Sequence, residues 1–101
     1  MKKRLRKKLE DGGPAEDILR AKRVSIETCR AIVDGEITPY EGARKIWWDA
    51  WAFARYNPLG DALTPFIGEA TEWEDHPEAR GEIDSDIRQK AAGLLALWAP
   101  P

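Results

Sequence analysis

Glu72 and His76 lie four residues apart, a spacing at which two side chains share one face of a helix and could hold a metal ion together. Glu69 and Asp75 are close to them in the chain. The chain has a single histidine and a single cysteine, however, whereas a zinc site takes about four ligands and a di-iron site needs further Glu-x-x-His pairs. We therefore expect no metal and no cofactor, and interpret these residues as the charged end of a solvated helix.

The other candidates for catalysis are Cys29 and pairs of carboxylates. Cys29 falls among apolar residues, and no motif joins it to the only histidine, so a small core residue is the simpler interpretation. Pairs such as Asp84 with Asp86 have no apolar setting in the sequence that would raise one pKa for acid–base work. No glycine-rich phosphate loop is present. The sequence thus predicts a protein without catalytic activity, and its one cysteine favours the reducing cytoplasm.

An excess of acidic residues is confined to about one quarter of the chain. Residues 61–86 hold nine acids and Arg80 as the only base, a net charge of −8, while the whole chain carries −2. A focused negative field attracts basic partners and repels nucleic acid. We predict a partner-binding surface here, although the same acids could serve only as the charged face that any soluble domain needs. Its residues are Glu69, Glu72, Trp73, Glu74, Asp75, Glu78, Glu82, Asp84 and Asp86.

The N-terminal residues 1–13 are predicted to form a flexible, disordered basic arm. Six of residues 2–8 are Lys or Arg and none is acidic. Each cation could neutralise a phosphate, but direct binding to nucleic acid is not favoured, because no aromatic is interleaved with the charges and the acidic domain opposes it. No apolar run approaches the roughly 20 residues that span a bilayer, and no apolar segment of a signal peptide follows the arm. We expect no membrane association.

The strongest structural signal is a helix over residues 39–56. Thr38 is a suitable cap, Pro39 suits the first helical position, and Glu41 can reach back to the cap residue. One face of this helix gathers apolar residues: Ala43, Ile46, Trp47, Ala50, Phe53 and Ala54. Trp48 projects from the other side, between Arg44 and Arg55, where either another segment of the chain covers it or it contacts a partner.

Three further helices are predicted around this one. The first runs from about Pro14 to Asp34, with Gly35 as the left-handed residue that ends it. Its inward side is expected to carry Ile18, Leu19, Ile26, Cys29, Ile32 and Val33. The next is expected to start or break at Thr64 and to end at Asp75, and the last to begin near Asp84 or Ser85 and to end before Pro100. The result is an all-α protein, a small four-helix bundle formed as a single domain by residues 14–101.

The order of these features resembles a known family. Gly35-Glu-Ile-Thr-Pro-Tyr-Glu-Gly-Ala-Arg44 opens the second helix, and Phe66 precedes Trp73-Glu-Asp-His-Pro77. The acidic stretch Arg80-Gly-Glu-Ile-Asp-Ser-Asp86 then leads into an amphipathic helix. Over residues 15–98 this pattern is similar to small bacterial immunity proteins of the colicin D immunity type. The resemblance implies a four-helix protein whose acidic residues occupy the active site of a tRNA-cleaving toxin.

These observations favour a non-catalytic, cytoplasmic immunity protein or antitoxin that neutralises a basic, nuclease-type toxin through residues 69–86. The alternative is a helical interaction protein that binds no toxin. It would self-associate, as a homodimer for example, or dock through the second helix, with Arg44, Trp48 and Arg55 at the interface.

Overall fold

The computed structural model describes residues 13–54 and 57–99, with side chains from Glu16 onward. Over these residues the chain forms four helical segments and no strand, which confirms the all-α four-helix prediction. Of the arm predicted over residues 1–13, only Gly13 is described, and it is the first residue of a helix. The elements are α2 (Gly13–Val33), α3 (Pro39–Ile46) continued by η2 (Trp47–Trp51) and α4 (Ala52–Ala54), then α5 (Pro58–Asp75), η3 (Pro77–Ala79) and α6 (Arg80–Trp98).

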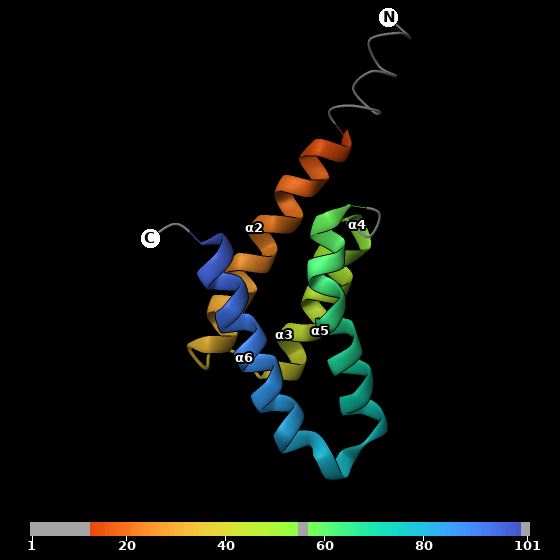
Figure 1. Ribbon diagram of the computed structural model, residues 1–101, viewed down its shortest axis with the longest axis vertical. Coiled ribbons are helices and arrows are strands. Elements are labelled where there is room, and N and C mark those ends of the chain that lie inside the picture. Colours follow the sequence, from red (N-terminus) through yellow and green to blue (C-terminus); the bar gives the residue numbers. More distant parts are fainter. Residues whose placement is uncertain (1–12, 55–56, 100–101) are drawn as a thin grey trace, which may run out of the picture.

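The helices enclose one hydrophobic core (Figure 1). α2 lies along α6, and the central segment made of α3, η2 and α4 packs between α2 and α5. α5 and α6 meet at the end of the molecule that lies opposite α4. No helix in the described part of the chain is long and apolar enough to cross a lipid bilayer. The largest fully buried side chains belong to Phe66, Ile32, Ile46, Leu63 and Ile87.

The turn between α2 and α3 is built by local sequence chemistry, as predicted. Gly35 has a φ of +78°, and the N–H of Glu36 donates to the Ala31 carbonyl at 2.8 Å to close the end of α2. The Thr38 hydroxyl accepts from the Glu41 N–H at 3.1 Å. The Glu41 carboxylate in turn accepts from the Thr38 hydroxyl, rather than from the backbone N–H that we expected. These contacts make α2 and α3 close neighbours.

The inward face of α2 matches the prediction only in part: Cys29 and Ile32 are fully buried as expected. Leu19 and Val33 were expected in the core, but they are 64% and 45% exposed. The buried face consists mainly of smaller residues: Ala21, Ser25, Thr28, Cys29 and Ile32. Ser25 can be fully buried because its hydroxyl donates to the Ala21 carbonyl at 2.7 Å. Small side chains let neighbouring helices approach closely. Close packing between the helices, more than the hydrophobicity of the side chains, therefore determines which face of α2 is buried.

The central helix is not the regular α-helix predicted over residues 39–56. It contains the π-turn η2 at Trp47–Trp51. A π-turn takes about one residue more per turn than an α-helix, so the residues after it move by about one position around the axis. Phe53, expected in the core, is therefore 56% exposed, while Ala54 remains buried. The part of the predicted face that precedes this shift is buried as expected: Ala43, Ile46 and Ala50.

Both later helices begin earlier than predicted. α5 starts at Pro58, because the Asn57 side chain accepts from the Leu59 N–H at 3.0 Å and so caps the helix there. It continues through Pro65, whose exposed position lets the carbonyl freed by the missing N–H face water. α6 starts at Arg80 rather than near Asp84, because the 3₁₀ turn η3 runs directly into it. Residues 78–82, which lie before the predicted start of this helix, are therefore helical in the structure.

Candidate partner-binding surface

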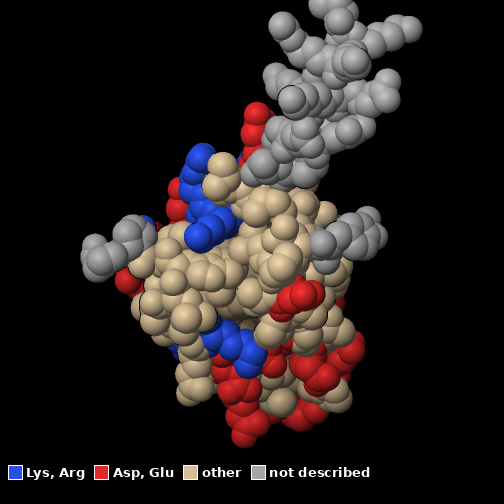
Figure 2. All heavy atoms as spheres, turned by 45° about the horizontal axis from the view of Figure 1, so that its top comes forward, with Lys and Arg blue, Asp and Glu red and all other residues tan. Residues whose placement is uncertain are grey.

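The predicted acidic residues gather where α5 meets α6. We call this the acidic surface and define it by the nine residues predicted above, between Glu69 and Asp86. Figure 2 shows acidic side chains concentrated at this end of the molecule. Trp73, Glu69 and Asp84 are partly buried. The exposed members are Glu72, Glu74, Asp75, Glu78, Glu82 and Asp86.

Trp73 is the internal anchor of this surface rather than an exposed contact residue. The Tyr40 ring stacks on it with centroids 3.9 Å apart and planes 13° apart. The guanidinium carbon of Arg80 lies 3.8 Å from the Trp73 ring centre. Two groups this close to one indole must occupy its opposite faces. The indole N–H donates to Asp84 Oδ1 at 3.0 Å. Trp73 therefore joins α3, α5 and α6 at one point.

Arg80, the only base in residues 61–86, is held by this anchor. Its Nε donates to the Trp73 carbonyl at 2.9 Å, and the residue is partly buried. This contact satisfies a carbonyl at the end of α5 while the guanidinium covers the indole. The Arg80 side chain thus links α5 to the start of α6. The carboxylates around it remain available at the surface for contact with a partner.

Tyr40 extends the acidic surface onto α3. Its hydroxyl donates to Glu74 Oε2 at 2.5 Å and accepts from Arg44 at 3.3 Å. Arg44, predicted as part of the alternative interface, therefore contacts the ring that stacks on Trp73. Tyr40 and Arg80 were not assigned to the site from the sequence. Their only sequence signals were Tyr40 at the edge of the apolar face of its helix and Arg80 as a lone base among acids.

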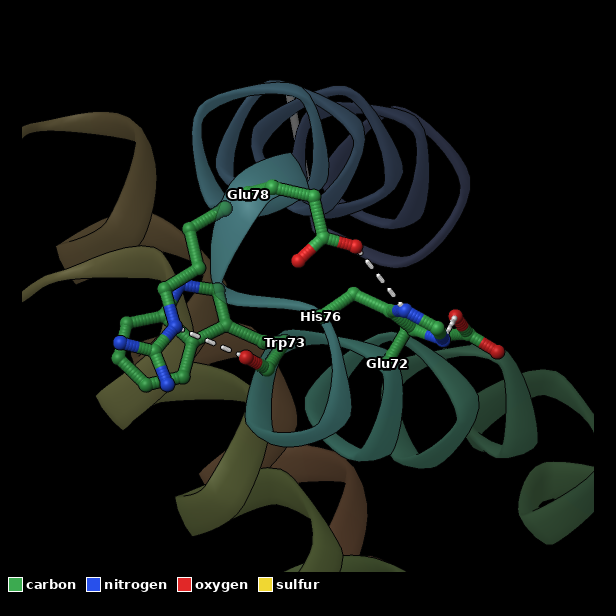
Figure 3. A network of polar contacts seen from close by, with 5 residues as sticks. Glu72, Trp73, His76 and Glu78 are labelled. Carbon is green, nitrogen blue, oxygen red and sulfur yellow. Dashed lines mark hydrogen bonds and ion pairs between the residues drawn. The ribbon is translucent and has the colours of Figure 1, made fainter.

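His76 lies between two carboxylates on the outer rim of the acidic surface (Figure 3). Its Nε2 is 3.3 Å from Glu72 Oε2, and its Nδ1 is 3.2 Å from Glu78 Oε1. All three side chains are more than half exposed. A hydrogen bond from the Glu78 backbone, together with the contact to His76, lowers the pKa of the Glu78 carboxyl. Glu78 therefore stays ionised to a lower pH than an ordinary glutamate does.

Glu69 has the least favourable setting of the acidic residues. Its Oε2 atom is buried and has no hydrogen-bond partner among the described residues. Burial raises the pKa of this carboxyl, and the nearby Asp86 and Glu72 raise it further, while Lys90 acts in the opposite direction. Glu69 faces α6 at the inner edge of the acidic surface and adds to its charge density at some cost in stability.

Two kinds of chemical site considered in the sequence analysis, a metal cluster and a reactive thiol, can be examined in the described part of the chain. Within the described part of the chain, no group of three or more His, Cys, Asp and Glu side chains could hold a metal ion. Cys29 is fully buried in α2, and burial raises the pKa of its thiol to about 12. A nucleophilic thiolate requires a lowered pKa, so Cys29 has the opposite of the required setting.

Of the predicted alternative interface, the structure describes Arg44 and Trp48. Trp48 is 55% exposed, so no described segment covers it, and its ring stacks on Trp47 with centroids 5.3 Å apart. Arg55 lies outside the described residues. η2, which carries Trp48, leads away from the α5–α6 turn toward α4 (Figure 1). The Trp48 face is therefore distinct from the acidic surface.

Comparison of this chain with known protein families, with curated proteins and with solved structures finds no match.

Proposed function

We propose that this protein is a non-catalytic immunity protein or antitoxin that neutralises a basic, nuclease-type toxin through the acidic surface. The observation that carries the proposal is the set of exposed carboxylates at the α5–α6 junction, whose one local base, Arg80, is tied to Trp73. The similarity in pattern to the colicin D immunity type points to the same class of partner. The proposal assigns the protein to the cytoplasm, where a single cysteine stays reduced.

The charges of the acidic surface suit a partner that binds phosphates. Asp75, Glu82 and Asp86 are exposed, and none has a hydrogen bond or ion pair with another described residue. A nuclease holds its substrate with Lys and Arg at the backbone phosphates. Carboxylates held on two helices can form ion pairs with those cations in place of the phosphates. Close charge pairs across an interface also speed association. Anchoring by Trp73 reduces the loss of side-chain and backbone freedom on binding.

The test is a colony count with the open reading frame next to the gene of this protein. That frame is expressed alone, with the wild-type protein, and with two charge-reversed variants. Asp75→Lys with Glu82→Lys reverses two unengaged acids of the acidic surface. Glu16→Lys with Asp17→Lys reverses two exposed acids of α2 and changes the net charge equally. Circular dichroism establishes that both variants are folded.

We expect the neighbour to kill alone, the wild type and the α2 variant to restore growth, and the acidic-surface variant to fail. Binding of the purified pair should also weaken steeply with salt. A harmless neighbour, or a toxic one that the protein does not neutralise, would contradict the immunity function. Equal protection by both variants would contradict the assignment to the acidic surface.

A further inference from the structure

Two large aromatic side chains of the central helix are exposed. Trp48 on η2 is 55% exposed and Phe53, which follows η2, is 56% exposed. The π-turn accounts for the exposure of Phe53, because its wider turn leaves this ring on the outside instead of in the core. Exposed aromatics on one helix are typical of association surfaces, and π-turns occur often at functional sites.

The charges beside these rings have both signs, and they are ordered along the helix. Arg44 and Lys45 precede Trp48, and Asp49 follows it; all three are exposed. Asp49 forms no ion pair with another described residue. A helix with about four residues per turn brings every fourth residue to the same side. One side therefore carries Lys45, Asp49 and Phe53, and the adjacent side carries Arg44 and Trp48. From its N-terminal end, the face presents basic residues, then Asp49, then Phe53.

We propose that two copies of this chain associate through this face, with the central helices antiparallel and Trp48 near the two-fold axis. In that arrangement the basic end of each copy lies opposite Asp49 and Phe53 of the other. Lys45 then pairs with Asp49 across the interface, and Arg44 lies over the partner's Phe53 ring. The sequence of charges fits its own antiparallel copy, whereas a uniformly basic or acidic partner would meet a like charge.

The size of the face sets the strength of the dimer. Residues 39–54 form a helix about 24 Å long. The exposed halves of four aromatic rings, two from each copy, supply roughly 400 Å² of buried surface. The whole contact falls below the roughly 1,200 Å² of standard interfaces, so the dimer should be weak, with a Kd of about 10–100 µM. The acidic surface is not part of it, and the dimer can bind its partners at both ends.

The test is sedimentation equilibrium of the full chain at concentrations from about 5 µM to about 1 mM, a range that brackets the expected Kd. The wild type should pass from monomer to dimer across this range. Trp48→Ala and Phe53→Ala should each raise the Kd at least about tenfold. Both side chains are exposed, so thermal unfolding of the dilute monomers should hardly change. Leu97→Ala, which trims an even more exposed apolar residue on α6, is the control and should dimerise like the wild type.

A pair of charge variants tests the antiparallel register. Asp49→Lys places four cations at its own dimer interface, and Lys45→Glu surrounds its own Asp49 with acids, so each variant alone should be monomeric. An equal mixture restores both cross pairs and should form a heterodimer with a Kd near that of the wild type. A wild type that is monomeric at about 1 mM overturns the proposal. So does a mixture that stays monomeric, or a Leu97→Ala variant as impaired as Trp48→Ala.

Discussion

Arg80 donates its Nε hydrogen to the carbonyl oxygen of Trp73 at 2.9 Å, and its guanidinium carbon lies 3.8 Å from the centre of the Trp73 ring. One side chain thus joins the last turn of α5 to the first turn of α6 by a hydrogen bond and a cation–π contact. The connection between these helices is only residues 76–79 long and has no side-chain cap at the start of α6. The Arg80–Trp73 contact therefore stabilises a junction that the backbone alone holds weakly.

Replacing Arg80 should destabilise the fold. Arg80→Gln removes the cation–π contact and weakens the hydrogen bond to the carbonyl, and we expect the free energy of unfolding to fall by about 1–2 kcal/mol. Chemical denaturation followed by tryptophan fluorescence measures this loss. Arg88→Gln removes an exposed base from the same helix and should cost less than about 0.5 kcal/mol. Equal losses in the two variants would show that the contact contributes nothing specific.

Gly42 should not tolerate even a methyl group. A Cβ at this position would overlap the Cγ1 and Cδ1 atoms of Ile32, which is fully buried on α2 and has no room to move. We expect Gly42→Ala to lower the free energy of unfolding by about 1–3 kcal/mol. Gly68→Ala is the control, because a Cβ there meets nothing within 4 Å in the middle of α5. That variant should be more stable than the wild type by about 0.5–1 kcal/mol, and thermal unfolding should move the two variants in opposite directions.

Cys29 should be unreactive until the protein unfolds. Burial raises the pKa of its thiol from 9.0 to about 12, so the folded protein holds the neutral thiol at pH 8. Alkylation by iodoacetamide should be at least about 100-fold slower in the folded protein than in denaturant. Because the folded pKa is the higher one, the stability that this group contributes is full below pH 9.0 and is lost as the pH rises towards 12. Rapid alkylation of the native protein at pH 8 would show that the thiol is accessible.

Glu69→Gln should change the acid dependence of stability. Burial raises the pKa of this carboxyl above the ordinary value of 4.5, so folding favours its protonated form. The wild type therefore loses stability as the pH rises from below 4.5 through the folded pKa, a loss that the glutamine variant escapes. At pH 7 we expect Glu69→Gln to be the more stable by about 1 kcal/mol, and near pH 4 the two should be equal. Urea denaturation at both pH values measures the difference, and a constant offset would rule out a titrating Glu69 as its source.

The helix boundaries predicted from the sequence were correct where a single local interaction determines them. Thr38, Pro39 and Glu41 start α3, and the left-handed Gly35 ends α2, because caps and turn residues act on their immediate neighbours. The start of α5 was wrong because Asn57-Pro58 was interpreted only as the end of one helix, although it also caps the next. The start of α6 was wrong because Asp84 was expected to cap it, whereas Asp84 accepts from the Trp73 indole within the helix.

The acidic surface was identifiable from its charge, but its internal construction was not. Eight of the nine acids, all but Asp61 in the first turn of α5, lie between residues 69 and 86, and helices carry them to one end of the fold. The stack of Tyr40, Trp73 and Arg80 depends on how α3, α5 and α6 meet, which no local pattern encodes. For the same reason Trp73 was predicted as a contact residue and proves to be partly buried. Ser25 and Thr28 were missed as core residues because packing between helices, rather than polarity, determined which side of α2 faces inward.

The π-turn at Trp47–Trp51 is a fault in the central helix. One surplus residue there joins two stretches that are each regular α-helix but differ in helical phase. The residues up to Ile46 keep one helical phase, and Ala54, which follows the fault, keeps the other. Both Ile46 and Ala54 are buried. Removing a single residue at the fault would restore a regular α-helix and leave Ala54 in the core, because the deletion offsets the surplus residue. The loss of one codon within the turn would therefore keep the core intact, whereas an α-helix that retained every residue would turn Phe53 inward and overfill the core.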